Sequence, residues 1–355
     1  MSRHRFQAIS SAMTFDRYLN ASDPWAAVRP FVDCFNAARK AHFVPGNVLV
    51  VDECMCGWRG REGKYCVDGM PHKTKIPRKP ESIGVEMKAV ACGESGILLR
   101  IEIMEGKERQ KMKAYADKHN DGTAVALRLT QDYNGTKRTV IGDSAFASVR
   151  TLVALWERGL YFMGHVKTAH CGYPKTILEQ WNNGDLSVWT TIGKPARGSH
   201  LLLESNNGDQ VFYALGWQDR KMLKLITNRG TTIPGSNAVR MRHRRVIDDD
   251  GFESTLRYAL EIKRPHMVEA FYQYFCAIDV HDHLRQGSLA MEMEWLTHKW
   301  WHRIVATIFG MVVVDAYLGF HLDTGGKDQG QDNFISFIDQ LAYQLINNHD
   351  LPALQ

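Results

Sequence analysis

The sequence lacks the features that define membrane, secreted and disulfide-stabilised proteins. Its longest apolar run, Ile304 to Val314, ends at Asp315 and is well short of the roughly 20 residues that a membrane-spanning helix needs. The segment from Met1 to Asp16 has neither an uninterrupted apolar stretch nor a small-residue cleavage site, so no secretory signal is expected there. Seven cysteines, an odd and scattered set, argue against a disulfide framework and indicate a reducing compartment. We therefore expect no membrane partner.

The sequence also has no compositional bias. Its 355 residues are 44% hydrophobic and 23% charged, with 11 Pro and 29 Gly, which excludes a disordered, collagen-like or low-complexity chain. The formal net charge is 44 − 39 = +5, a surplus that permits contact with phosphates without demanding it. The length suits about two domains, or one large domain with an insertion. Function must therefore be inferred from motifs.

Apolar spacing predicts helices first and a buried strand next. Two helices are expected before residue 47, the second running from Trp25, behind an Asp23-Pro24 cap, to the break at Pro45-Gly46. The β-branched run Val48 to Val51 then predicts a buried strand that ends at Asp52-Glu53.

The next segment alternates between strand and helix patterns. We expect a hairpin of two strands, a polar helix, another strand ending at Gly142-Asp143, and a helix. Their ranges are Val85 to Cys92, Ile97 to Met104, Lys107 to His119, Arg138 to Ile141 and Val149 to Arg158. This order is typical of an α/β layer protein.

A β-rich insertion is predicted from Cys171 to Phe252, where Asn-Gly turns separate short strand-like runs such as Leu186 to Thr191 and Gln210 to Leu215. Because insertions sit at surface points of a scaffold, we expect that it can be removed. Helical periodicity resumes over 268–285 and 300–320. A linker over 323–333 leads to a last amphipathic helix.

Three aspartates stand where a metal site is expected. Asp52 and Asp143 follow β-runs, and Asp279 lies in a helical segment with Asp282 on the same face. Carboxylates beyond adjacent strand ends, joined by one from a packed helix, offer the hard oxygen ligands that suit Mg²⁺ or Mn²⁺. Two such ions bind the attacking and leaving oxygens of a phosphodiester. Taken singly, an aspartate at such a place is more often a turn former or a helix cap.

The short sequence segments around these aspartates resemble motifs of the piggyBac transposase family. The matching blocks are Val50-Val51-Asp52-Glu53 with Trp58-Arg59-Gly60-Arg61 and Ile76-Pro77-Arg78-Lys79-Pro80, then Gly142-Asp143-Ser144-Ala145-Phe146-Ala147-Ser148, and then Ala277-Ile278-Asp279-Val280-His281-Asp282. The family usually has Asn where Ser144 stands and Gly-Gly-Val where Cys276-Ala277-Ile278 stands. The resemblance runs from Met1 to Leu345 in ordered blocks.

This resemblance implies an α/β fold: an RNase H-like catalytic core with a helical N-terminal segment and a β-rich insertion. The implied parts are an N-terminal helical segment (1–46), the first part of the core (47–170), the insertion (171–252), the second part of the core (253–322), and a linker with a C-terminal helix (323–355). The family's long N-terminal segment and cysteine-rich C-terminal module have no counterpart here. We therefore expect a truncated or domesticated catalytic region.

The resemblance also implies a function. Asp52, Asp143 and Asp279 would be the metal-binding triad for Mg²⁺ or Mn²⁺, and Asp282 an accessory catalytic acid. The implied activity is metal-dependent cleavage and transfer of DNA strands in the nucleus, and the implied partners are double-stranded DNA and transposon ends, with a homodimer as a candidate assembly. The alternatives are a catalytically silent DNA- or chromatin-binding protein of the same fold, and a nuclease without strand transfer.

Two basic segments are candidate DNA-binding sites. They comprise Lys73, Lys75, Arg78 and Lys79, and then Arg240, Arg242, Arg244 and Arg245. Either segment can neutralise phosphates, although such runs are often only solvated faces. The second also fits a nuclear import signal.

Three weaker patterns have plain alternative explanations. Cys54, Cys56, Cys66 and His72 lack the usual paired spacing of a zinc site, so free cysteines are expected. His281 and His283, two apart, point in different directions on a helix. Trp300-Trp301 can stack on bases but is expected in the core.

Overall fold

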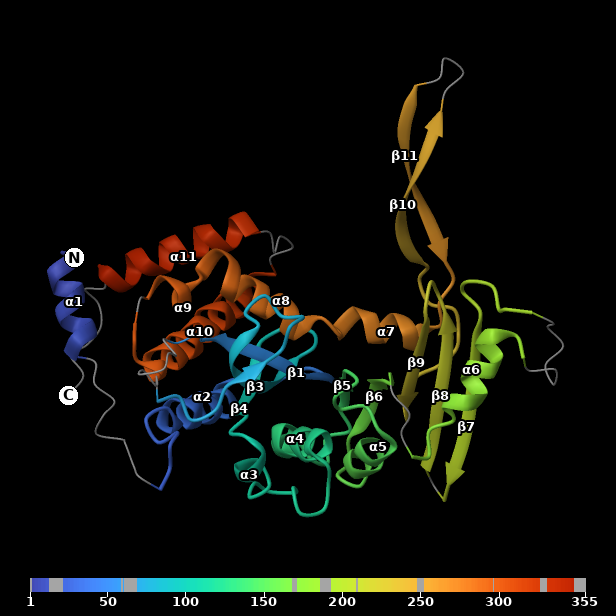
Figure 1. Ribbon diagram of the computed structural model, residues 1–355, viewed down its shortest axis with the longest axis horizontal. Coiled ribbons are helices and arrows are strands. Elements are labelled where there is room, and N and C mark those ends of the chain that lie inside the picture. The colour runs from blue at the N-terminus through green and yellow to red at the C-terminus, as the bar shows by residue number, and fades with distance from the viewer. Residues whose placement is uncertain are drawn as a thin grey trace, which may run out of the picture. The chain divides into compact units, whose positions relative to one another are not determined.

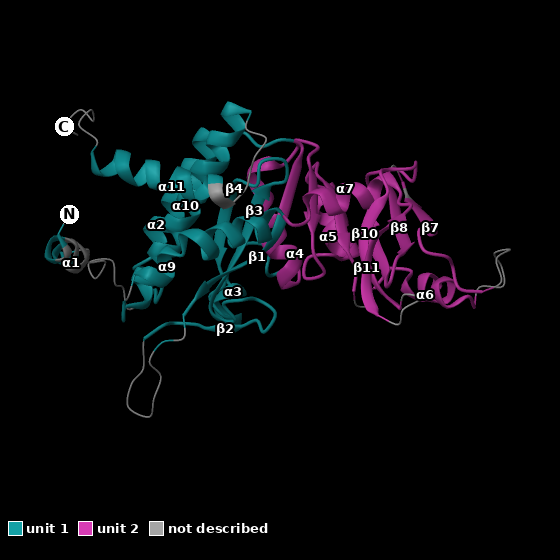
Figure 2. Ribbon diagram, turned by 90° about the horizontal axis from the view of Figure 1, so that it is seen from above, with its two compact units in different colours: residues 1–46, 51–117, 277–355 teal, residues 47–50, 118–276 magenta. Residues whose placement is uncertain are grey.

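The computed structural model describes residues 2–12, 22–58, 60, 69–167, 171–185, 193–208, 210–247, 252–295, 297–325 and 331–347. The chain divides into two compact units, which Figure 2 colours separately. Unit 1 comprises residues 1–46, 51–117 and 277–355, and unit 2 comprises 47–50 and 118–276. The first three residues of the first strand thus belong to unit 2 and the rest of that strand to unit 1. Unit 2 thus includes residues 171–252 and continues to Cys276.

Unit 1 packs helices around one end of a sheet (Figure 1). Its elements are α1 (Arg3–Ala12), α2 (Arg29–His42), β1 (Val48–Gly57), β2 (Thr74–Lys75), β3 (Ile83–Cys92), β4 (Leu98–Ile103), α3 (Lys107–Gln110), α8 (Ala277–Leu284), α9 (Met291–Glu294), α10 (Trp300–Thr324) and α11 (Gln331–Ile346). A π-helical turn spans Arg285–Leu289. The expected hairpin is confirmed, because β3 and β4 pair antiparallel with a bulge between Val90 and Ala91.

The core of unit 1 forms between its strands and α10. Buried apolar side chains from α2, β1, β3, β4 and α10 make one cluster, in which Trp25 meets Trp300 edge-on at 5.5 Å between ring centroids. α10 is long and apolar enough to cross a membrane, but 67% of its most apolar window is buried inside the protein. The expectation that Trp300 belongs to the core is confirmed.

Unit 2 comprises strands, helices and a separate two-stranded ribbon. Its elements are α4 (Asp121–Thr130), β5 (Thr139–Gly142), α5 (Val149–Trp156), β6 (Tyr161–His165), α6 (Lys175–Asn183), β7 (His200–Asn207), β8 (Gln210–Gln218), β9 (Met222–Thr227), β10 (Ala238–Ile247), β11 (Glu253–Ile262) and α7 (His266–Tyr274). β5 and β6 run parallel, whereas β9 is antiparallel to β6 and β8. The ribbon is an antiparallel pair of β10 and β11.

Nine of the described strands form a mixed sheet, in the order β2-β3-β1-β5-β6-β9-β8-β7, with β4 beside β3. The α/β class is therefore confirmed. Three strands of the expected insertion, β7, β8 and β9, extend this sheet, because β9 pairs directly with β6. The expected strand over 186–191 lies outside the described residues.

β1 does not end at Asp52-Glu53 as predicted but continues to Gly57. The side chains of Cys54, Met55 and Cys56 are buried, and the Trp58 N–H donates to the carbonyl of Ile83 at 2.9 Å. The chain beyond the two acids therefore still has hydrogen-bond partners on β3. A Cβ at Gly84 on β3 would lie 2.0 Å from the Cys56 carbonyl oxygen. Glycine thus permits this close approach.

Two helix predictions were wrong at their ends. The helix expected from Trp25 begins at Arg29, because the Asp23 carboxylate accepts the Trp25 N–H at 3.1 Å and makes a turn there. The polar helix expected over 107–119 ends at Gln110, and Tyr115 has a φ of 69° that no α-helix accommodates.

Candidate active site

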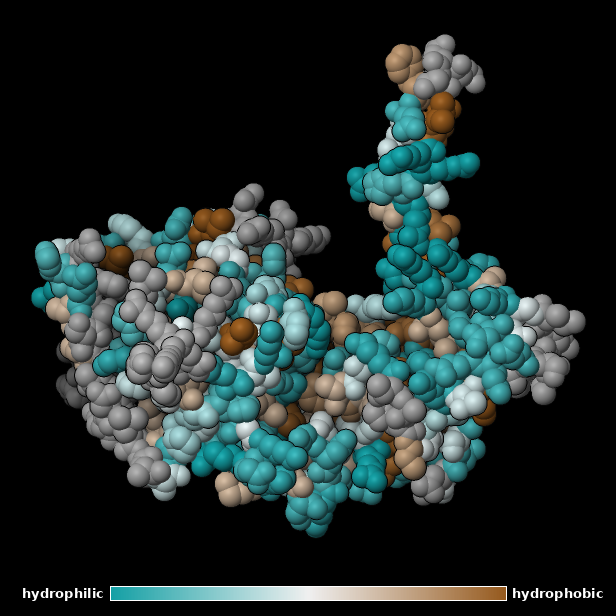
Figure 3. Space-filling view, in the orientation of Figure 1, coloured by the Kyte–Doolittle hydropathy of each residue, from teal (hydrophilic) through white to brown (hydrophobic). Residues whose placement is uncertain are grey.

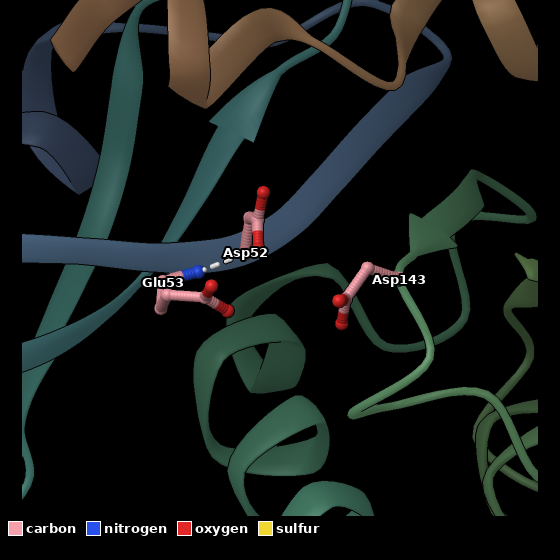
Figure 4. A group of neighbouring side chains, drawn as sticks. All are labelled: Asp52, Glu53 and Asp143. Atoms are coloured by element: carbon pink, nitrogen blue, oxygen red, sulfur yellow. Dashed lines mark hydrogen bonds between the residues drawn. The ribbon is translucent and has the colours of Figure 1, made fainter. Parts of the chain in front are cut away.

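β1 carries two adjacent acids into the interior. Asp52 is 4% exposed and Glu53 is 2% exposed. Asp52 Oδ1 accepts the N–H of Glu53 at 2.8 Å (Figure 4). Burying carboxylates is costly unless they are paired or bind a cation, so the question at each acid is what neutralises it.

The second predicted aspartate lies where the sequence placed it, directly after β5. Asp143 is 5% exposed, and its Oδ1 accepts the N–H of Ala145 at 2.8 Å. Its own carbonyl accepts N–H groups from Phe146 and Ala147. Ser148 then caps α5 by accepting the Thr151 N–H at 3.0 Å. The motif therefore forms a turn that holds the Asp143 carboxylate just past the strand end.

The acids of β1 and β5 form one group. Asp52, Glu53 and Asp143 are all buried, and each offers a carboxylate oxygen within 4.8 Å of the others (Figure 4). Topology explains this: β1 is next to β5 in the sheet, and Asp52 lies two residues beyond Val50 on the same strand. Three buried carboxylates at this spacing fit a hard divalent cation. Glu53 was not in the predicted triad. The sequence shows it beside Asp52, but the strand that carries both acids was expected to end there.

Protein cations surround Glu53. Arg78 pairs with Glu53 Oε1, and the ammonium of Lys88 lies 3.5 Å from Oε2. Burial by itself would raise the pKa of Glu53, but Lys88, the hydrogen bond with Asp52 and Arg78 together hold that pKa below its usual value. Glu53 is therefore ionised at neutral pH and already largely neutralised by the chain.

The third predicted aspartate is bound by a lysine and lies outside the acidic group. Asp279, in the first turn of α8, has a half-exposed side chain, and its Oδ1 accepts a hydrogen bond from Lys79 Nζ at 2.8 Å. The same ammonium donates to the Glu53 carbonyl at 3.1 Å and lies 3.9 Å from Asp282 Oδ2. Asp279 and Asp282 thus share a face, as predicted. Lys79 joins them to the main chain of β1.

Lys79 remains charged in this position. Its side chain is only 9% exposed. Burial alone would lower its pKa, but the hydrogen bond to Asp279 and the charges of Asp282, Asp279 and Asp52 raise the pKa above the usual value. A pocket of about 290 Å³ opens beside it, and its lining residues are Lys79, Pro80, Asp279, Asp282, His283, Gln286 and Gly287.

Asp282 belongs to a buried ionic network. Its Oδ1 accepts a hydrogen bond at 2.9 Å from Arg285, whose side chain is fully buried and also pairs with Glu292. Arg285 donates further to the Met55 carbonyl at 2.9 Å. Burial disfavours the charged guanidinium, but Asp282 and Glu292 raise the pKa of Arg285 above its already high value. These contacts make Asp282 a residue that ties α8 to β1.

A histidine next to Asp143 was not singled out from the sequence. The parallel register pairs Gly142 with Gly164, which places His165 of β6 alongside Asp143. Burial and the Lys167 charge lower the pKa of His165, while Asp143 acts in the opposite direction. The only sequence signal was that His165 lies in the short segment Gly164-His165-Val166-Lys167, which resembles the family's sequence.

The predicted DNA-binding residues are divided between two environments. Arg78 and Lys79 face the acids, whereas Lys75 on β2 is exposed and Lys73 precedes that strand. Arg240, Arg242, Arg244 and Arg245 lie on β10, where Arg240 pairs with Asp219 at 3.2 Å.

The other candidates follow their plain explanations where the structure describes them. Cys54 and Cys56 are buried free cysteines, and burial raises their pKa values. Cys66 lies outside the described residues. His281 is buried against Asp315 at 3.2 Å and His283 is exposed, so the two point apart.

Comparison with known families decides the identity. A family model described as "Transposase IS4" matches residues 1–317. The chain belongs to this transposase family. DDE transposases of this kind typically use divalent metals, and the acidic group lies in the matched region.

A solved structure shows the same fold as this IS4-family chain. It is the piggyBac transposase, determined by cryo-EM in a synaptic complex with hairpin DNA, and the TM-score is 0.62 at 17% identity. The match covers 94% of this chain and 60% of that chain, so the IS4-family chain spans less than two thirds of the length of the piggyBac chain. The large mixed sheet is consistent with an RNase H-like catalytic core. No match was found among curated proteins.

Proposed function

We propose that this IS4-family chain is a piggyBac-like transposase domain that cleaves and transfers strands of double-stranded DNA at transposon ends. The observation that carries the proposal is the buried group of Asp52, Glu53 and Asp143, in which one carboxylate oxygen from each residue lies within 4.8 Å of the other two. Three carboxylates this close repel one another, and a divalent cation relieves that repulsion. The piggyBac structure contains DNA, which supports DNA as the partner here.

Asp52 and Asp143 would hold Mg²⁺ or Mn²⁺, with Glu53 beside them. When bound, such ions activate water and stabilise the attacking and leaving oxygens of a phosphodiester. Asp279 would complete the set once Lys79 releases its carboxylate. Lys79 is long enough to turn from Asp279 toward a DNA phosphate, which offers it an equivalent anionic partner. Asp282 retains Arg285 and keeps α8 in place.

Replacing Asp143 by Asn tests this function. Loss of one charge should abolish nicking of supercoiled plasmid in Mg²⁺ or Mn²⁺, a decrease of at least about 100-fold, while DNA binding in EDTA is unchanged. Asp117→Asn is the matched control, because Asp117 is exposed and the change is identical. Nicking by the parent chain that persists in Asp143→Asn, or in EDTA, would overturn the proposal.

One observation favours the catalytically silent alternative. The ammonium of Lys79 neutralises Asp279 from inside the protein, which is what a domain without a metal at that acid requires. DNA binding by the parent chain without nicking in either metal would establish that alternative.

Nuclear localisation and a homodimer on paired transposon ends are parts of the same proposal. The basic run on β10 supports import. Imaging of a fluorescent fusion tests the first, and light scattering with and without end DNA tests the second.

A further inference from the structure

The ribbon of β10 and β11 is an exposed element of unit 2. Ten residue pairs join its strands, from Ala238 with Ile262 to Ile247 with Glu253, and no other described strand pairs with either. Figure 1 shows the ribbon standing away from the rest of unit 2. Leu256 is 53% exposed and Tyr258 is 43% exposed. A two-stranded ribbon by itself is marginally stable in water, so a surface that covers it would stabilise it.

Strand alternation gives the two faces of the ribbon different charges. The arginine face carries Arg240, Arg242 and Arg244, paired with Leu260, Tyr258 and Leu256. No acid lies among these six residues. The opposite face mixes both signs, because Glu253 and Glu261 stand there with His243, Arg245 and Arg257.

The arginines differ in how they are held. Arg240, at the root, pairs with Asp219 and lies over the Tyr272 ring at 6.0 Å from the centroid. Within the described part of the chain, Arg242 and Arg244 have no acidic partner at salt-bridge distance. Figure 3 shows mainly hydrophilic side chains along the ribbon, with apolar ones between them. The face thus offers free guanidinium groups beside apolar and aromatic surface.

We infer that the arginine face of this ribbon binds duplex DNA in the major groove. The inference rests on the proposed function for DNA as the partner. The major groove is about 12 Å wide and admits a two-stranded β-ribbon. Alternate residues on a β-strand are about 6.8 Å apart. Two nucleotide steps along one DNA strand, each with an axial rise of about 3.4 Å, cover the same distance. Arg242 and Arg244 therefore match the spacing of the DNA along the groove, and the charge of this face is complementary to it.

The test compares two double variants of the full chain with the same loss of charge. Arg242→Gln with Arg244→Gln alters the arginine face, and Arg245→Gln with Arg257→Gln alters the opposite face. Fluorescence anisotropy with a short linear duplex in EDTA, over a salt series, should show at least a roughly tenfold loss of affinity for the first pair. Its salt slope should fall by about 2, as for two lost phosphate contacts. Equal losses for both pairs would overturn the inference.

A second arm identifies the groove. Duplex carrying glucosylated 5-hydroxymethylcytosine, which fills the major groove, should bind the parent chain at least about tenfold more weakly, whereas netropsin in the minor groove should have little effect. The reverse pattern would overturn major-groove binding. Because every arm is read without metal, failure of nicking leaves these results intact. A parent chain that binds no duplex at all would overturn the proposed function and the inference together.

Discussion

At the scale of single residues, the acids of this protein differ in what neutralises them. Asp279 and Asp282 face Lys79, and Glu53 faces Arg78 and Lys88. The chain therefore supplies a cation to each of these three acids. A metal ion that used Asp279 would compete with the ammonium of Lys79, so Lys79 sets how tightly that acid can take part.

Lys79→Met should therefore tighten metal binding. Removing a positive charge within about 4 Å of the acids favours a divalent cation by more than about 1 kcal/mol even in a screened environment, which is at least about fivefold in affinity. Titration of Mn²⁺ by electron paramagnetic resonance measures the affinity directly. Lys75→Met is the matched control, since Lys75 is an exposed lysine of β2. Equal affinities in both variants would show that Lys79 does not restrain the site.

At the scale of elements, a charge cluster connects the start of α2 to α3. Glu105 has a 3% exposed side chain and pairs with Arg29 and Arg109 at 2.7 Å and with Lys113 at 3.1 Å. Burial by itself would raise its pKa, but these cations lower the pKa to about 2. Because the folded pKa lies below the unfolded one, the cluster stabilises the fold above the ordinary carboxyl pKa, and that stability is lost as pH falls toward 2.

Glu105→Gln should remove this pH dependence. At neutral pH we expect a loss of about 1–3 kcal/mol in the free energy of unfolding, after allowance for solvent screening. The difference from the parent chain should shrink as pH falls from about 4.5 toward 2. Urea unfolding over a pH series measures it. Glu108→Gln is the control, because the Glu108 side chain is 82% exposed and pairs with Lys111 at the surface; a similar loss there would contradict a specific role for Glu105.

Elements with a strong local pattern could be predicted, and elements decided by tertiary contacts could not. The β3–β4 hairpin, β5, α5 and α10 have clear turns, caps or long apolar runs, and each appears where expected. β1 was cut short because Asp52-Glu53 resembles a strand end; only pairing with β3 shows that it continues. α4 was missed because its face periodicity is weak: eight of its residues are buried.

The same limit applies to the site. The sequence motifs identified Asp52 and Asp143 as site residues, since each follows a β-run. They did not reveal that Lys79, 200 positions away along the chain, would bind Asp279, because such a contact is a property of the folded chain. Glu53 and His165 joined the site through strand pairing, which one sequence does not display.

At the scale of the whole molecule, the β-rich segment is part of the sheet rather than a separable attachment. β9 pairs with β6, and β8 pairs with β9. Leu215, Trp217 and Leu225 are fully buried in these strands. Removing residues 171–252 would expose an edge of β6 and take away β10, the partner of β11. An exposed hydrophobic sheet edge promotes aggregation.

The sheet order thus changes the expectation for a deletion. A chain without residues 171–252 should be insoluble or should lose cooperative unfolding. By contrast, a chain in which an Asn-Gly turn replaces residues 242–258 should remain folded. Met241 and Ala259 are a directly paired register position, and a two-residue Asn-Gly loop closes such a hairpin. Solubility, circular dichroism and a cooperative thermal transition distinguish the two. A soluble, cooperatively folded product of the larger deletion would show that β7, β8 and β9 are dispensable, whereas unfolding of the shortened ribbon would show that the exposed part of β10 and β11 stabilises unit 2 even though it buries little surface.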